Sequence, residues 1–374
     1  MVGLGGLLVA ATCVPARATE VRRPGPAGGW SPAPAPAATL ASPTPATPAL
    51  PPGAGTAGAA PQAQRAQTVI DGREVLVPIP GAERLRIDNP LGNVTIRAWD
   101  RAEAMHIVAE KQSTSREALS RLRVHFTAWA GGEISVETRV EAGGRERAMP
   151  LTASRIDLVI EVPPDLEIEA KTFAGELTAS GLRAGARLET TAGRIAVSDV
   201  HGRVVTHQLR GGQYVVAVAG DVDLDGVEGH MQIERLEGAR LEARVVDGDI
   251  RAEDIRSDEV RLGATTGEVV LVGLIQPRAR YDLRSYEGAV KLIVAGAPRG
   301  FELRARSPQP IASALPLQML WQRGDRMRAT VAPVGAHGEA GTPSRGRPVI
   351  ELSSVLGRVV LETAVALDET SGAR

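Results

Sequence analysis

The chain has 374 residues, enough for one large domain or two small ones. Its 43 basic and 44 acidic side chains give a formal net charge of -1, so the composition excludes the basic excess typical of proteins that bind nucleic acid or anionic membranes. A single cysteine, Cys13, excludes an intrachain disulfide.

The N-terminus resembles a secretory signal peptide over residues 1–18. An apolar run at residues 7–11 precedes the small-residue sequence Ala16-Arg-Ala18, although the usual positive segment before Leu7 is missing. We therefore expect export to the periplasm, cell envelope or cell surface. A floppy apolar terminus is the alternative, and a lipoprotein anchored through Cys13 is a weaker one, because Thr12 fits that signal poorly. No later stretch is long and apolar enough to span a bilayer.

Residues 19–67 form a Pro- and Ala-rich segment that holds 11 of the 26 prolines between residues 22 and 66. With few large apolar side chains it cannot offset the entropy of folding, so we expect a disordered, partly polyproline linker. From residue 68 the pattern becomes strand-like, at Val75–Ile79, Arg84–Asp88 and Gly92–Ile96. Thr114-Ser-Arg-Glu117 is typical of a capping box that begins one short helix, and strands are expected again at Glu133–Glu137 and Ile156–Val162.

A repeated pentad, Gly-x-apolar-x-apolar, dominates the middle of the chain. Successive copies lie 18, 19, 17, 19, 19 and 21 residues apart and begin at Gly175, Gly193, Gly212, Gly229, Gly248, Gly267 and Gly288. A second series of strands runs between them, as in Gly202-Arg-Val-Val-Thr, so each period holds two strands. Such a period predicts an all-β, single-stranded parallel β-helix (β-solenoid) with about 17–21 residues per coil.

Strand alternation defines which side chains of the pentad face inward. The expected inward column is Leu177, Ile195, Tyr214, Met231, Ile250, Val269 and Val290. The glycines suit tight corners because glycine adopts left-handed backbone conformations without steric cost. We expect the repeat core to cover 172–294 within one domain of 68–365. Phe301–Ala305 and Arg326–Val331 cap its C-terminal end, Gly357–Leu361 closes the fold, and 366–374 is a disordered tail.

The sequence from Ile160 to Leu177, leading into the glycine coils, resembles the bacterial adhesin-like β-solenoid family, a domain of unknown function. The resemblance covers roughly Ile87 to Leu361 and implies an exported or envelope-associated solenoid with no catalytic residues to transfer. The Ser or Thr usual before the glycine is replaced in His207–Gly211 and Arg244–Asp247, so the resemblance implies distortion of those coils.

Two acidic clusters are candidate sites. Asp221, Asp223 and Asp225 have the spacing of an EF-hand loop, but Gln232 stands where the bidentate carboxylate belongs. Asp247, Asp249 and Glu268 on adjacent coils are the candidates for a polysaccharide-active β-helix enzyme, and a column of solvated charges is the alternative. We expect no catalytic, cofactor or metal site, and we expect these aspartates to point into solvent.

Other chemistry finds little support. The histidines show no metal-ligand spacing, and Tyr286, at a corner, is the best candidate for an exposed aromatic platform. The sequence therefore favours a non-enzymatic envelope protein that binds or scaffolds an unknown envelope protein or glycan, with no cofactor and no nucleic-acid partner. The alternatives are a polysaccharide-active enzyme and a regulatory envelope-stress partner of a membrane protein.

Overall fold

A computed structural model describes residues 69–101, 103–128, 132–141, 154–297, 299–334 and 347–364. Contacts divide the chain into two units, Met1–Ala63 and Gln64–Arg374, and every described residue belongs to the second. The expected signal peptide (1–18), linker (19–67) and tail (366–374) lie outside the described residues.

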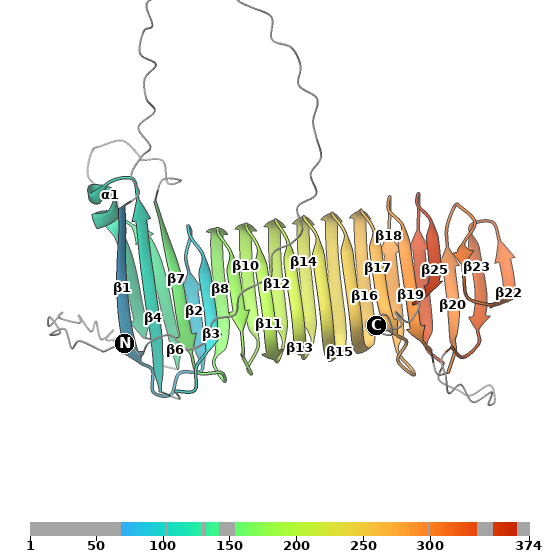
Figure 1. The fold of residues 1–374 in the computed structure, drawn as a ribbon, viewed down its shortest axis with the longest axis horizontal. Helices are drawn as coiled ribbons and strands as arrows, with labels where there is room; N and C mark the ends of the chain where they lie inside the picture. The colour runs from blue at the N-terminus through green and yellow to red at the C-terminus, as the bar shows by residue number, and fades with distance from the viewer. Residues whose placement is uncertain are drawn as a thin grey trace, which may run out of the picture. The chain divides into compact units, whose positions relative to one another are not determined.

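The repeats form coils with two strands each, one on each of two walls (Figure 1). The first wall contains β8 (Glu167–Ala174), β10 (Ala186–Ala192), β12 (Val204–Arg210), β14 (Val222–Glu228) and β18 (Arg280–Ser285). The second wall contains β9 (Leu177–Ser180), β11 (Ile195–His201), β13 (Gln213–Ala219), β17 (Val269–Leu274) and β19 (Val290–Gly296). Two long strands, β15 (Met231–Asp247) and β16 (Ile250–Thr266), pass from the second wall to the first. Neighbouring coils pair in parallel, which confirms the predicted β-solenoid.

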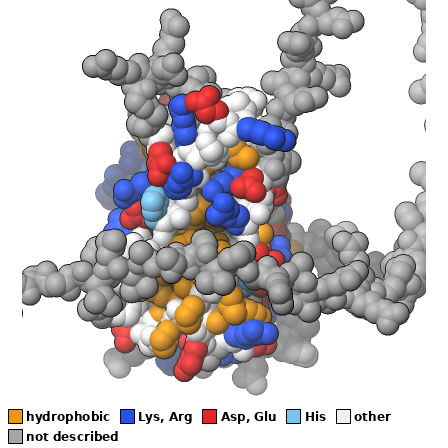
Figure 2. Space-filling view, turned by 90° about the vertical axis from the view of Figure 1, so that its left-hand side faces the viewer, with side chains coloured by type: hydrophobic (Ala, Val, Ile, Leu, Met, Phe, Trp, Pro, Cys, Tyr) orange, Lys and Arg blue, Asp and Glu red, His pale blue; other side chains and the backbone are white. Residues whose placement is uncertain are grey.

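The chain folds back on itself at the N-terminal end of the stack. The coil of β2 (Arg84–Asp88) and β3 (Val94–Ala98) pairs with β8 and β9. Beyond it lie β6 (Glu133–Val140) and β7 (Ser154–Val162), which pair in parallel with β2 and β3. Antiparallel strands complete the cap: β5 (Leu122–Ala128) on β6, β4 (Ala104–Ser113) on β7, and β1 (Val69–Pro78) on β4. Seen from this end, hydrophobic side chains reach the surface in the lower half of the molecule (Figure 2).

The one helix among the described residues, α1 (Arg116–Arg121), begins one residue later than the predicted capping box implies. Ser115, not Thr114, is the N-cap: its backbone is extended and its hydroxyl accepts the Ala118 N–H at 3.1 Å. Glu117 forms an i,i+4 ion pair with Arg121 instead of reaching back to the cap. No helix among the described residues is long and apolar enough to cross a membrane.

The C-terminal end is interleaved in the same way. The last coil, β24 (Val349–Ser354) and β25 (Val359–Thr363), pairs directly with β18 and β19. The earlier strands β20 (Phe301–Arg306) and β21 (Ala312–Ser313) lie outside it, followed by antiparallel β23 (Arg326–Val331) and β22 (Leu317–Arg323). Each end thus closes with antiparallel strands, as expected for a stack whose open edges must be capped.

The core is the space between the two walls. Leu177, Ile195, Ile250 and Val269 are fully buried and stand in one register column, as predicted. The two coils without the usual Ser or Thr still form continuous parallel pairs with their neighbours. The distortion implied by the resemblance therefore does not occur in the strand register. In one of these coils Gln208 supplies a side-chain donor at the corner, since its Nε2 donates to the Gly193 carbonyl.

The corner glycines are required by close approach as well as by backbone angle. Gly267 has φ +131°, and a Cβ on it would lie 2.1 Å from the carbonyl oxygen of Gly248 in the preceding coil. Because the obstacle is backbone, any larger residue must push two coils apart. Ser285 supports the corner by donating to the Gly267 carbonyl and accepting the Gly288 N–H, both at 2.8 Å.

One coil departs from the predicted register. The corner residue is Gly211 rather than Gly212, so the inward position between Ile195 and Met231 belongs to Gln213, and Tyr214 lies half-buried on the outer face. The Gln213 amide is buried yet satisfied: its oxygen accepts from the Thr206 hydroxyl, and its nitrogen donates to the Asp225 carbonyl at 2.8 Å. A hydrogen-bonded pair therefore replaces an apolar contact in this coil.

Candidate functional site

The outward side chains of the first wall form rows that run across the stacked coils. Because the pairing is in register, equivalent positions on successive strands stand side by side, about 4.8 Å apart. One row contains charges of both signs and consists of Asp223, Glu242, Arg261, Asp282, Glu351, Arg304 and Arg328. The next row holds arginines and no carboxylate over its last seven positions: Arg244, Gly263, Arg284, Ser353, Arg306, Arg326 and Arg323.

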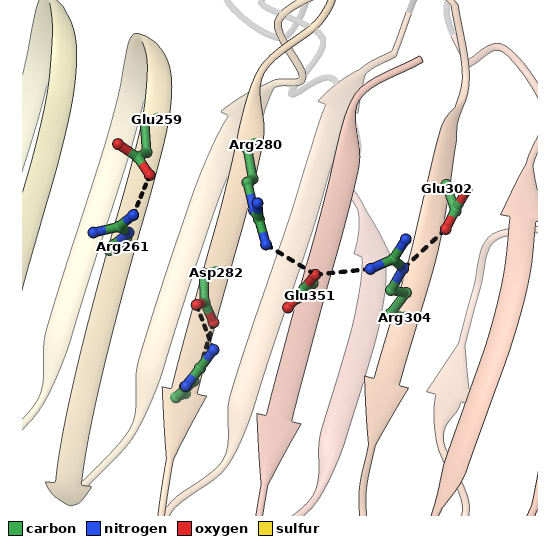
Figure 3. Close-up of polar contacts among 8 residues, drawn as sticks. Glu259, Arg261, Arg280, Asp282, Glu302, Arg304 and Glu351 are labelled. Atoms are coloured by element: carbon green, nitrogen blue, oxygen red, sulfur yellow. Dashed lines mark hydrogen bonds and ion pairs between the residues drawn. The ribbon is translucent and has the colours of Figure 1, made fainter. Parts of the chain in front are cut away.

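Ion pairs link these rows along and across the strands (Figure 3). Glu351 accepts from Arg280 at 3.4 Å and from Arg304 at 3.2 Å, and so joins three neighbouring strands. Arg284 grips Asp282 with two nitrogens, at 2.6 and 2.7 Å. Farther toward the middle of the stack, Glu242 is almost completely buried between Arg240 and Arg244. Most of the wall's charge is thus paired.

At the C-terminal end of this wall, arginines lower the pKa of two neighbouring carboxyl groups. Arg328, donating at 2.9 Å, and then Arg304 hold the pKa of Glu302 below its usual range, against the opposing effect of burial. A hydrogen bond from Arg306 likewise lowers the pKa of Asp325. Glu302 and Asp325 therefore stay ionised into more acidic solution than free carboxylates do.

We define the arginine patch as the charged residues of β18, β24, β20, β23 and β22 together with Asp325 of the β22–β23 turn. It contains seven arginines and four carboxylates, three net positive charges: Arg280, Arg284, Arg304, Arg306, Arg323, Arg326, Arg328, Asp282, Glu302, Asp325 and Glu351. The middle strands β14, β15 and β16 have the opposite balance, with six arginines and eleven carboxylates. A chain of nearly zero net charge therefore has an excess of positive charge on some strands and an excess of negative charge on others.

The arginine patch surrounds a shallow depression of about 510 Å³. Trp321 stands at its edge with 44% of its surface exposed, beside Arg328 in register. A β-bulge between Met319 and Trp321 turns this indole outward. The depression joins an aromatic surface to guanidinium groups, a combination suited to binding.

The aspartates with EF-hand spacing do not converge. Asp221 accepts the backbone N–H groups of Ala239 and Arg240 at 3.1 and 3.0 Å, so it caps the next coil rather than facing solvent alone. Asp223 and Asp225 lie on the first wall, where Asp225 faces His207 at 3.4 Å. Among the described residues no group of three or more His, Cys, Asp or Glu side chains is arranged to hold a metal ion.

Two of the three acidic residues considered for catalysis are engaged with other groups. Asp249 accepts the Glu268 N–H at 2.7 Å, and Glu268 pairs with Lys291 at 2.7 Å. Asp247 is exposed at the end of β15. The prediction that solvent alone satisfies the aspartates is therefore wrong for Asp221 and Asp249, because the parallel stacking places the next coil's N–H groups within their reach.

Two further clusters lie outside the arginine patch. On the second wall, Arg194 lies over the Tyr214 ring, 5.0 Å from its centroid, and the Tyr214 hydroxyl contacts His230 Nε2. In the N-terminal cap, His106 lies between Glu161 at 2.9 Å and Glu74 at 2.8 Å. These hydrogen bonds, that to Glu161 first, raise the pKa of His106.

Sequence reasoning missed the arginine patch. Tyr286 is half exposed, as expected, but Trp321 falls in a stretch for which the sequence predicts neither regular structure nor a binding role. The signal was present in the alternation Arg304-Ala-Arg306 and Arg326-Met-Arg328 on predicted strands, which places each pair of arginines on one face. The antiparallel pairing that brings the two faces together could not be read from the sequence.

Comparisons with known proteins give the chain a family. A crystal structure of a candidate cell adhesion protein from Clostridium sporogenes aligns over 79% of this chain and 100% of its own, with 11% identity and a TM-score of 0.24. No curated protein matches the chain. The family model described as Toastrack DUF4097 matches residues 82–308, more than half of the sequence, including most of the solenoid. The chain therefore belongs to the Toastrack DUF4097 family, a domain of unknown function.

Proposed function

We propose that this protein is a non-enzymatic binding or scaffolding protein of the cell envelope, exported by its N-terminal segment. Family membership and the all-β solenoid agree with a binding or scaffolding role. Export and the envelope location rest on the signal-like residues 1–18 and on the Pro-rich segment that follows them.

The observation that carries the proposal is the state of the first wall's carboxylates. Glu302, Glu351 and Asp282 each accept from one or more arginines on the same open, gently hollowed face. A hydrolase or lyase of acidic polysaccharides needs a general acid or base that is free to exchange protons with its substrate. Carboxylates whose oxygens already accept hydrogen bonds from arginine are poorly placed for that role, whereas a rigid wall of stacked strands presents a fixed pattern of charge to a partner.

Cell fractionation together with envelope binding tests the proposal. The full chain, expressed in its native host with a C-terminal tag, should be found with the periplasm or envelope. The purified protein should co-sediment with isolated envelopes in a saturable manner and release no soluble sugar from them. Cytosolic retention would contradict export, and steady release of sugar fragments would instead favour the polysaccharide-active enzyme.

A further inference from the structure

We propose that the arginine patch binds an acidic polysaccharide whose carboxylate groups recur along an extended chain, laid across β18, β24, β20, β23 and β22. This assignment rests on the proposed binding function and names its ligand class. Neither the net charge of the chain nor its family membership implies it.

Three arginines of the patch recur at regular intervals across neighbouring strands. Arg306, Arg326 and Arg323 lie on three successive strands, in the row that runs from Arg244 to Arg323. Their side chains therefore recur about every 4.8 Å. A single small anion could engage one or two of them. A ligand that uses the row as a whole must carry negative charge at regular intervals, as a linear polyanion does.

These three arginines are available to bind a carboxylate of a ligand. Arg323 and Arg326 form no ion pair with any described residue, and both are exposed. Arg306 pairs with Asp325, whose side chain is itself open to solvent. Such exposed ion pairs contribute little to stability, so an incoming carboxylate can replace Asp325 at small cost. The planar guanidinium then binds a carboxylate through two parallel hydrogen bonds.

Trp321 distinguishes a sugar polymer from other polyanions. Its exposed indole face lies at the edge of the depression, where the apolar face of a sugar ring can pack against it. Single-stranded nucleic acid is bound by successive aromatic platforms on which bases stack, whereas the described lining of the depression includes one aromatic side chain, Trp321. The negative balance of β14, β15 and β16 repels a polyanion and confines it to the C-terminal coils.

The test measures binding of the full chain to polygalacturonate by biolayer interferometry over a series of salt concentrations. We expect saturable binding that weakens as salt rises, and at least tenfold weaker binding for R306Q/R326Q. The matched control is R251Q/R256Q on β16, whose arginines pair with Glu253 and Asp254, and we expect it to bind like the wild type. Trp321→Ala should weaken binding several-fold and leave its salt dependence unchanged. Circular dichroism and thermal melting confirm that each variant is folded.

Further arms separate the alternatives. Fully methyl-esterified polygalacturonate should not bind, and polyphosphate of similar length should bind more weakly because it offers the indole no sugar ring. Equal loss in R306Q/R326Q and R251Q/R256Q, no loss in R306Q/R326Q, or tighter binding to polyphosphate or to anionic vesicles would overturn the assignment. If R306Q/R326Q still co-sediments with envelopes like the wild type, the glycan assignment fails while the envelope-binding function stands. If the wild type binds neither envelopes nor polygalacturonate, both fail.

Discussion

At the scale of single residues, the buried pair of Gln213 and Thr206 shows how this core tolerates polar atoms. Gln213→Leu removes the partners of the Thr206 hydroxyl and the Asp225 carbonyl, so it should lower the free energy of unfolding by about 1–3 kcal/mol. The double variant T206V/Q213L buries no orphaned hydroxyl and should lose less than the two single changes together. Urea unfolding of all four proteins gives the coupling, and strictly additive losses would contradict the proposed pairing.

The corner aspartates give a second prediction at this scale. Asp249→Ala removes an acceptor for the Glu268 N–H and should cost about 0.5–1.5 kcal/mol, whereas Asp249→Asn keeps an oxygen there and should be nearly neutral. Asp247→Ala is the control, since Asp247 is exposed beside the same corner. Equal stability of the D249A and D247A variants would exclude a capping role for Asp249.

The same reasoning extends to all five aspartates of the two acidic clusters. Replacing Asp221, Asp223, Asp225, Asp247 and Asp249 with Asn should leave the melting temperature nearly unchanged, with or without calcium, because Asn retains the accepting oxygen at the corners. Saturable calcium binding that disappears in the fivefold variant would restore the metal site.

His106 makes stability depend on pH with a definite sign. Its pKa is raised in the folded protein, so the stabilisation is fully present below the unfolded pKa of about 6.5 and is lost as pH rises through the folded value. The difference in unfolding free energy between wild type and His106→Gln should therefore be larger at pH 5.5 than at pH 9. Denaturant titrations at the two pH values measure this difference in free energy. A difference that grows toward pH 9 would contradict stabilisation of charged His106 by Glu74 and Glu161.

At the scale of elements, the glycine corner sets the spacing of the coils. Gly267→Val should cost about 1–3 kcal/mol, because its Cβ meets the Gly248 carbonyl and its φ is positive. Gly263→Val is the matched control: that glycine lies four residues earlier on β16, a Cβ added there would have no neighbour within 4 Å, and the change should stay within about 0.5 kcal/mol. Chemical denaturation that ranks the two variants equally would exclude the corner as the cause.

The architecture of these coils could be predicted from the sequence in most places but not in all. The period and the alternation predicted parallel coils and their buried columns because each repeat carries its own register signal. At Gly211-Gly212 two adjacent glycines fit the corner equally well, and Tyr214 was a more plausible core residue than Gln213, so the local choice was wrong. Hydrogen bonds from Thr206 to a buried amide depend on the facing wall, which no local pattern reveals.

The ends of the stack were predictable only in part. Strand positions such as 301–305 and 326–331 follow from alternation, and the structure has them as β20 and β23. The return of β24 to lie between β18 and β20, and of β25 to lie between β19 and β21, is a long-range pairing without a local signal. Because the arginine patch is built from these non-sequential strands, its existence could not be foreseen either.

At the scale of the whole described solenoid, charge is segregated although the total is balanced. The middle strands β14, β15 and β16 carry an excess of carboxylates spread over both walls, and the C-terminal strands of the first wall carry an excess of arginine. Paired charges on a rigid sheet keep the wall hydrated and prevent pairing with other molecules, while unpaired arginines at one end leave it able to bind. Binding without turnover is the central claim of the proposed function.

Isothermal titration calorimetry of the full chain with polygalacturonate tests that claim most directly, because one trace records both binding and catalysis. We predict heat pulses that shrink to saturation, with the baseline returning to its starting level after every injection and no new reducing ends or unsaturated products at the end. A baseline that stays displaced while substrate remains, accompanied by such products, would contradict the account and identify the protein as a polysaccharide-active enzyme.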